Sequence, residues 1–174
     1  MRNDSKKWQA PGIITEQGFA FAGGQLKPVP LKHLTTISGT LSQTLSASKC
    51  DAAFGWPDII LADRYAVHLR RDRIMVINAP ELDDGWDPDR AIAITDASYG
   101  FCTFDLIGPR ALELLQCCGE IDLNEISTGV SRLMNGLMVM LYRYGSQDCF
   151  RMHISLPNRE AFLEILSRKS QNWT

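Results

Sequence analysis

The chain has 174 residues, of which 45% are hydrophobic and 22% charged, and its 18 Lys and Arg against 20 Asp and Glu give a net charge of −2. This composition is average for a globular domain and offers no excess of positive charge for binding nucleic acid or an anionic membrane. No run approaches the ~20 apolar residues that span a bilayer, and residues 1–12 lack the apolar region of a signal peptide, so we expect a cytoplasmic protein.

The N-terminal part of the chain alternates short apolar segments with turn residues. After a loose arm over residues 1–12, we expect short extended pieces broken by turns over 13–34. A short helix over 38–50, or a loop, would place Leu41, Leu45 and Ala47 on one face. Apolar alternation over 65–69 and the apolar run 74–77, separated by a polar turn, predict a β-hairpin. The acidic segment 80–90 is expected to be a loop.

The C-terminal part has clearer signals. Strands are expected over 91–94 and 101–107, followed by a helix over 109–118 with Gly108 as its N-cap and Gly119 in a left-handed C-terminal cap. Two more strands, over 137–144 and 149–155, precede a last helix from Pro157 to about Lys169. The residues expected to face inward from the two helices are Ala111, Leu112, Leu115, Cys118, Ala161, Phe162, Ile165 and Leu166.

This order predicts an α+β fold with antiparallel sheets and helices on one face. The order strand, helix, strand, strand, helix matches most of a ferredoxin-like split β-α-β unit, and residues 38–95 resemble a degenerate second copy. We therefore expect one α+β domain over 13–169, divisible into halves at about 13–95 and 96–169, and a C-terminal tail over 170–174.

The sequence contains no recognisable catalytic or metal-binding motif. Five cysteines without C-x-x-C spacing are best explained as reduced thiols. His153 lies in a predicted strand and is expected to be a hydrogen-bonded sheet histidine rather than a base. The acidic loop lacks the ligand spacing of a calcium site and is expected to be solvated; its carboxylates are Asp83, Asp84, Asp87 and Asp89.

Two features could serve contacts with another protein. Arg70 and Arg71 crowd the predicted hairpin tip with His68 and Arg73, where they either face water or grip a partner's carboxylate. Residues 137–141 are apolar at every position, which indicates a strand covered on both faces, by the other half of the chain or by another polypeptide. Met138 and Met140 are the candidate contacts there. Trp8, Trp56, Trp86 and Trp173 either anchor an interface or fold back on the domain.

Two segments resemble the gamma subunit of heterotetrameric sarcosine oxidase. Residues 96–123 read DASYGFCTFDLIGPRALELLQCCGEIDL, in which Gly108, Pro109, Arg110 and Ala111 lie between a strand and a helix and Asp122 follows at the expected distance. Residues 127–166 read STGVSRLMNGLMVMLYRYGSQDCFRMHISLPNREAFLEIL and match that family's continuation, a turn leading into an apolar strand, a hairpin and the last helix. Residues 1–60 show no such correspondence.

The resemblance implies a fold like the folate-binding domain of aminomethyltransferases. It also implies a structural gamma subunit in a complex with alpha, beta and delta chains. Such a complex oxidatively demethylates sarcosine to glycine, with hydrogen peroxide and, when tetrahydrofolate is present, methylenetetrahydrofolate as products. FAD, FMN, NAD, zinc and tetrahydrofolate would then be held by partner subunits, and none by this chain.

Two other functions remain open from the sequence. A stand-alone tetrahydrofolate-binding or one-carbon-transfer module would need a carboxylate for the pterin, for which Asp96, Asp105 and Glu120 are the candidates. A homo-oligomeric scaffold domain is the other alternative. The chain lacks the Lys-Gly-Cys-x-x-Gly-Gln-Glu signature of folate-dependent iron–sulfur repair proteins, which argues against that branch of the fold.

Overall fold

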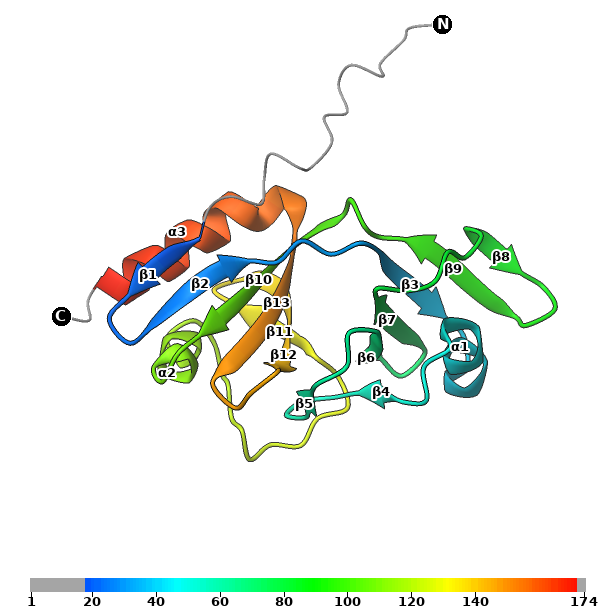
Figure 1. The fold of residues 1–174 in the computed structure, drawn as a ribbon, viewed down its shortest axis with the longest axis horizontal. Helices are drawn as coiled ribbons and strands as arrows, with labels where there is room; N and C mark the ends of the chain where they lie inside the picture. The colour runs from blue at the N-terminus through cyan, green and yellow to red at the C-terminus, as the bar shows by residue number, and fades with distance from the viewer. Residues whose placement is uncertain (1–17, 172–174) are drawn as a thin grey trace, which may run out of the picture.

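A computed structural model describes residues 18–171, which form two β-sheets side by side with helices on their outer faces (Figure 1). The α+β class expected from the sequence is confirmed. The expected arm over 1–12 and the last three residues of the expected tail lie outside the described residues. No helix between residues 18 and 171 is long and apolar enough to cross a membrane.

The larger sheet contains the strands that the C-terminal periodicity predicted. Its spatial order is β1 (Phe19–Phe21), β2 (Gly24–Pro28), β10 (Phe101–Ile107), β13 (Cys149–Ser155), β12 (Leu137–Tyr144) and β11 (Ser131–Met134). All of these neighbours are antiparallel, and the short β5 (Ile59–Ile60) adds a parallel pairing with β12.

The smaller sheet is built around the predicted hairpin. Its order is β4 (Ala53–Phe54), β6 (Tyr65–Arg70), β7 (Arg73–Ile77), β3 (Leu34–Ser38), β9 (Ile92–Asp96) and β8 (Gly85–Asp87). The expected strand over 91–94 is β9, shifted by one residue at its start. The acidic segment 80–90 is not wholly a loop, because β8 lies within it and pairs with β9.

The two sheets have the same strand order. In each sheet, one edge hairpin is followed along the sequence by a strand of the other sheet. Read from the hairpin inward, the larger sheet runs β1, β2, β10, β13, β12, β11 and the smaller runs β8, β9, β3, β7, β6, β4. Hairpin β1–β2 precedes β3 in the chain but pairs with β10, and hairpin β8–β9 precedes β10 but pairs with β3. The sheets therefore do not follow the expected division at residue 95.

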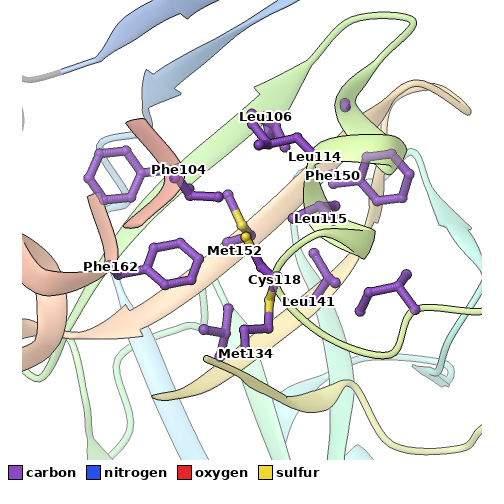
Figure 2. Close-up of a cluster of buried hydrophobic side chains, with 14 of the residues drawn as sticks. Phe104, Leu106, Leu114, Leu115, Cys118, Met134, Leu141, Phe150, Met152 and Phe162 are labelled. Atoms are coloured by element: carbon purple, nitrogen blue, oxygen red, sulfur yellow. The ribbon is translucent and has the colours of Figure 1, made fainter. Parts of the chain in front are cut away.

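Helices α2 (Ala111–Gln116) and α3 (Arg159–Gln171) cover the outer face of the larger sheet. Figure 2 shows the resulting core, in which Phe162 and Leu115 from the helices lie with Phe104, Leu141 and Met152 from the strands. These five residues are at most 1% exposed. The 3-10 helix η3 (Leu156–Asn158) leads into α3, so the predicted helix from Pro157 begins as a tighter turn.

Several details of the predicted helices are wrong. Helix α2 begins at Ala111 and its N-cap is Arg110, because the carbonyl of Arg110 accepts the first α-helical hydrogen bond, from the N–H of Leu114, whereas the carbonyl of Gly108 accepts only a tighter-turn bond from Ala111. Its C-cap Cys117 is right-handed, so Gly119 provides no left-handed cap. The buried positions also differ from those predicted: Leu114 is buried and Leu112 half-buried, Ala161 is exposed, and α1 (Leu41–Ser48) buries Thr44, Ala47 and Ser48 while Leu41 is 40% exposed.

The inner faces of the two sheets pack against each other, so β12 is covered on both sides by its own chain. Val139 and Leu141 point to the helices, whereas Met140 and Tyr142 join Tyr65 and other residues of the smaller sheet in a second core. This explains the apolar residues from Val139 to Leu141 without a second polypeptide, whereas Met138 stays 54% exposed. Met140 is 8% exposed, so it cannot be the surface contact that the sequence suggested.

Candidate functional site

Most of the buried ionisable groups form one hydrogen-bond network between the two sheets. It consists of Asp105, Arg151, Tyr65, Tyr142, His153 and Thr103, from strands β10, β13, β6 and β12. Alternation along β10, β12 and β13 directs these side chains away from the helices, and the smaller sheet then closes over them.

Arg151 lies at one end of this hydrogen-bond network, where each of its three guanidinium nitrogens donates a hydrogen bond. Its Nε and Nη2 each donate to a carboxylate oxygen of Asp105 at 2.8 Å, and its Nη1 donates to Tyr65 Oη at 3.2 Å. The guanidinium carbon lies 3.5 Å from the centre of the Tyr144 ring, a cation–π contact. The two charged side chains are only 7% and 13% exposed, so the bidentate geometry compensates for their loss of water.

The other end of the hydrogen-bond network carries no charge. Tyr65 Oη lies 2.8 Å from Tyr142 Oη, which lies 2.5 Å from His153 Nε2, and His153 Nδ1 lies 2.9 Å from Thr103 Oγ1. Burial and the nearby Arg151 lower the pKa of His153 to about 3. Burial raises the pKa of Tyr65 to about 12 and that of Tyr142 well above 10.

One arrangement of protons gives every hydrogen bond of the network a donor and an acceptor. Since Arg151 only donates, Tyr65 can donate to Tyr142, Tyr142 to Nε2 of neutral His153, and Nδ1–H of His153 to Thr103. General acid–base catalysis needs a group that titrates near the working pH, and the pKa values of His153 and both tyrosines lie far from neutrality. The arrangement fits a structural connection between the sheets, and the expectation of a hydrogen-bonded sheet histidine is confirmed.

The Gly-Pro-Arg-Ala motif joins two turns of the larger sheet. Gly108 lies so close to the β1–β2 turn that a Cβ atom would be 2.3 Å from the carbonyl oxygen of Gly23. The backbone N–H of Arg110 donates to that same oxygen at 3.2 Å, and its guanidinium makes two hydrogen bonds to Glu113. Ala111 is fully buried at the start of α2. Further along, the carbonyl of Asp122 accepts the indole N–H of Trp56 at 2.7 Å.

The other candidate contact residues differ in exposure. Arg70 and Arg71 are exposed at the tip of hairpin β6–β7, and Arg70 pairs with Asp72 at 2.7 Å. Met138 is 54% exposed, and Leu133, directly opposite it on β11, is 64% exposed. Leu133 could not be predicted as a contact from the sequence, because the four-residue strand β11 has no distinct apolar pattern.

The tryptophans also differ in exposure. Trp56 is 2% exposed and packs in the core, so it has folded back on the domain and anchors no interface. Trp86 on β8 is 64% exposed. Trp8 and Trp173 lie outside the described residues.

The three carboxylates considered for a pterin do not converge. Asp96 lines an open cleft of about 320 Å³ at one end of the smaller sheet, with His33, Thr35 and the acidic loop. Hydrogen bonds from Ser98 lower the pKa of Asp96. Asp105 is held by Arg151, and Glu120 is exposed after α2. Nothing in the described chain brings the three to one pocket.

Within residues 18–171, no group of three His, Cys, Asp or Glu side chains is placed to hold a metal ion. All five cysteines are free thiols, of which Cys117 is exposed. Burial raises the pKa of Cys102 and of Cys149 to about 11, so both are protonated at neutral pH.

Comparisons with known proteins identify the fold. No protein-family model and no curated protein matches the chain. Among solved structures, it is similar to a chain of the heterotetrameric sarcosine oxidase from Corynebacterium sp. U-96 in complex with pyrrole 2-carboxylate, with a TM-score of 0.67 and 15% sequence identity. The match covers 94% of this chain and 92% of that chain, so the two have nearly the same length. At this identity the match shows the fold alone.

Proposed function

We propose that this chain is the gamma-type accessory subunit of a sarcosine oxidase-like complex. The observation that carries the proposal is the fold similarity over nearly the full length of both chains. The complex would contain alpha, beta and delta chains as well. It would demethylate sarcosine to glycine, forming hydrogen peroxide and, with tetrahydrofolate, methylenetetrahydrofolate.

The described residues favour a structural role for this chain. Its buried ionisable groups hydrogen-bond to one another between the sheets, and the Gly-Pro-Arg-Ala motif makes contacts within the larger sheet. FAD, FMN, NAD, zinc and tetrahydrofolate are therefore assigned to the partner subunits in this proposal.

Leu133 and Met138 are the first candidates for contact with those subunits. They face each other across β11 and β12 and project on the same side of the larger sheet as buried Met140. The smaller sheet covers Met140 but leaves this apolar pair exposed. The exposed Arg70 and Arg71 form a second candidate contact, because guanidinium groups bind carboxylates at protein interfaces.

The proposal is tested by expressing the chain with and without its neighbouring genes and purifying through a tag on this chain. We expect a yellow complex that releases peroxide when sarcosine is added, and a colourless chain when it is expressed alone. A colourless chain without co-purifying proteins in both cases contradicts the proposal. Binding of tetrahydrofolate by the chain alone, measured by calorimetry, would instead favour the stand-alone module.

A matched pair of variants tests the contact. Met138→Glu places a charge in the exposed apolar pair, and we expect it to reduce recovery of the partner subunits at least tenfold. Trp86→Glu makes the same kind of change on β8, at the far end of the smaller sheet, and should leave recovery unchanged. Equal recovery with both variants would rule out the Leu133–Met138 pair as the contact.

A further inference from the structure

The open cleft at one end of the smaller sheet contains a nearly buried hydroxyl group without a hydrogen-bond partner. Thr35 of β3 lines this cleft, is 8% exposed, and lies between Val76 of β7 and Asp96 of β9 in the sheet. Within residues 18–171 its hydroxyl makes no hydrogen bond, and it keeps contact with solvent. The hydroxyl is therefore free to bond to a molecule in the cleft.

Packing alone does not account for a threonine at this position. Alternation places Thr35 on the same face of β3 as Ile37, which is fully buried with Val76 in the core beneath α1. Valine has nearly the same shape as threonine and would pack there without a polar group that lacks a partner. A ligand that bonds to the hydroxyl of Thr35 does account for it.

Four carboxylates line the same cleft, those of Glu81, Asp83, Asp84 and Asp96. No lysine or arginine of residues 18–171 forms an ion pair with them, since the ion pairs of the described chain involve other carboxylates. His33 is the one basic residue of the lining. Like charges gathered in a concave surface repel one another and attract cations from solution. The charge of the cleft therefore favours a cationic ligand.

Two of these carboxylates are held in place and still have an oxygen to offer. Asp84 Oδ1 accepts the backbone N–H of Asp96 at 2.7 Å, and Asp96 Oδ1 accepts the N–H and the hydroxyl of Ser98 at 2.9 and 2.5 Å. The second oxygen of each makes no hydrogen bond within the described part of the chain. Both can therefore accept a hydrogen bond from a ligand.

The arrangement of these groups favours an organic cation over a metal ion. No three His, Cys, Asp or Glu side chains between residues 18 and 171 are placed to share a metal ion. A primary ammonium group, in contrast, has three donors that separate oxygens can share. The cleft volume of about 320 Å³ is at the lower end for ligand sites, and Pro80 and Leu82 add apolar surface that a carbon chain can cover.

We propose that the cleft formed by Thr35, residues 80–84 and Asp96 binds a small organic ammonium ion. Its N–H groups donate to the free carboxylate oxygens of Asp84 and Asp96, with Thr35 as a further acceptor, and its carbon chain lies on Leu82. The proposal does not depend on the proposed function, because the cleft is formed by this chain alone.

Isothermal titration calorimetry of the full chain with 1,5-diaminopentane tests the proposal, because this probe carries two ammonium groups on an apolar chain. We expect a Kd of about 1 mM or lower at low ionic strength. Magnesium chloride supplies the same cation charge without N–H donors or an apolar chain, and it should bind at least about tenfold more weakly. Equal binding of the two cations, or no binding of the diamine at about 10 mM, overturns the proposal.

Two matched pairs of variants locate the site. Thr35→Val should weaken diamine binding at least about fivefold, whereas Thr36→Val, on the opposite face of β3, should not. Asp96→Asn keeps the oxygen that accepts from Ser98 but removes the charge, and should weaken binding at least about tenfold. Asp89→Asn removes the same charge at an exposed position outside the cleft and should leave binding unchanged. Equal effects within either pair overturn the proposal.

Discussion

Protonation of His153 should control how the protein loses stability in acid. The pKa of His153 is about 3 in the folded protein because of burial and Arg151, whereas an unfolded histidine has a pKa near 6.5. Between these pH values the unfolded chain binds one more proton than the folded chain. Stability contributed by this site is therefore present above pH ~6.5 and is lost as the pH falls toward ~3.

The magnitude follows from the proton difference. One proton contributes about 1.4 kcal/mol per pH unit, so lowering the pH from 6.5 to 5 should reduce the free energy of unfolding by about 2 kcal/mol through this residue. His153→Gln removes the titration while keeping an amide that can accept from Tyr142 and donate to Thr103. The variant should therefore lose about 2 kcal/mol less than the wild type over this range.

Urea denaturation followed by tryptophan fluorescence at several pH values between 5 and 7 measures this difference. Trp56 lies in the core and should report on unfolding. His33→Gln removes an exposed histidine and controls for the change in composition. Parallel losses of stability in the wild type and His153→Gln would refute the reasoning, because His153 would then bind its proton equally well in both states.

Three further substitutions or reactions follow from the geometry. Gly108→Ala should destabilise the protein by at least about 2 kcal/mol in urea denaturation, because the φ of Gly108 is 138° and a Cβ would be 2.3 Å from a carbonyl oxygen. The control is Gly100→Ala, where the nearest atom to a Cβ would be 3.4 Å away, and it should change the free energy of unfolding little. Equal effects of the two substitutions would contradict this account. Asp105→Ala should cost about 3 kcal/mol in the same assay because Arg151 stays buried without its carboxylate; a cost below about 1 kcal/mol would show that water replaces the pair. A thiol reagent at neutral pH should modify exposed Cys117 first, as mass spectrometry of the native protein would show; faster reaction of a buried cysteine would contradict the described packing.

The elements with regular apolar spacing could be predicted from the sequence because their burial is local. Alternation over 65–69 and the apolar run 137–141 predicted β6 and β12. The prediction that β12 is covered on both faces is confirmed from Val139 onward, since Val139 faces the helices and Tyr142 the smaller sheet, but Met138 is exposed. The ion pair between Arg168 Nη2 and Glu164 Oε1, at 2.5 Å, joins positions i and i+4 of α3, a spacing that can be seen in the sequence.

Features that depend on long-range pairing could not be predicted. No local signal says that hairpin β1–β2 pairs with β10, or that Met140 lies beneath the smaller sheet. The helix start at Ala111 was missed because the N–H of Arg110 is bonded to the carbonyl of Gly23, a contact between residues far apart in the sequence.

The exchange of hairpins between the sheets constrains how the chain can fold as it is synthesised. Lys27 of β2 pairs with Asp105 of β10, so hairpin β1–β2 has no sheet to join until β10 has been synthesised. The smaller sheet can assemble once β9 has emerged, which is earlier. Closing such distant pairs costs loop entropy and slows folding. The nascent chain must therefore keep Phe19, Phe21 and Leu26 from aggregating during this interval, a period in which a chaperone or a co-translated partner would have the most effect.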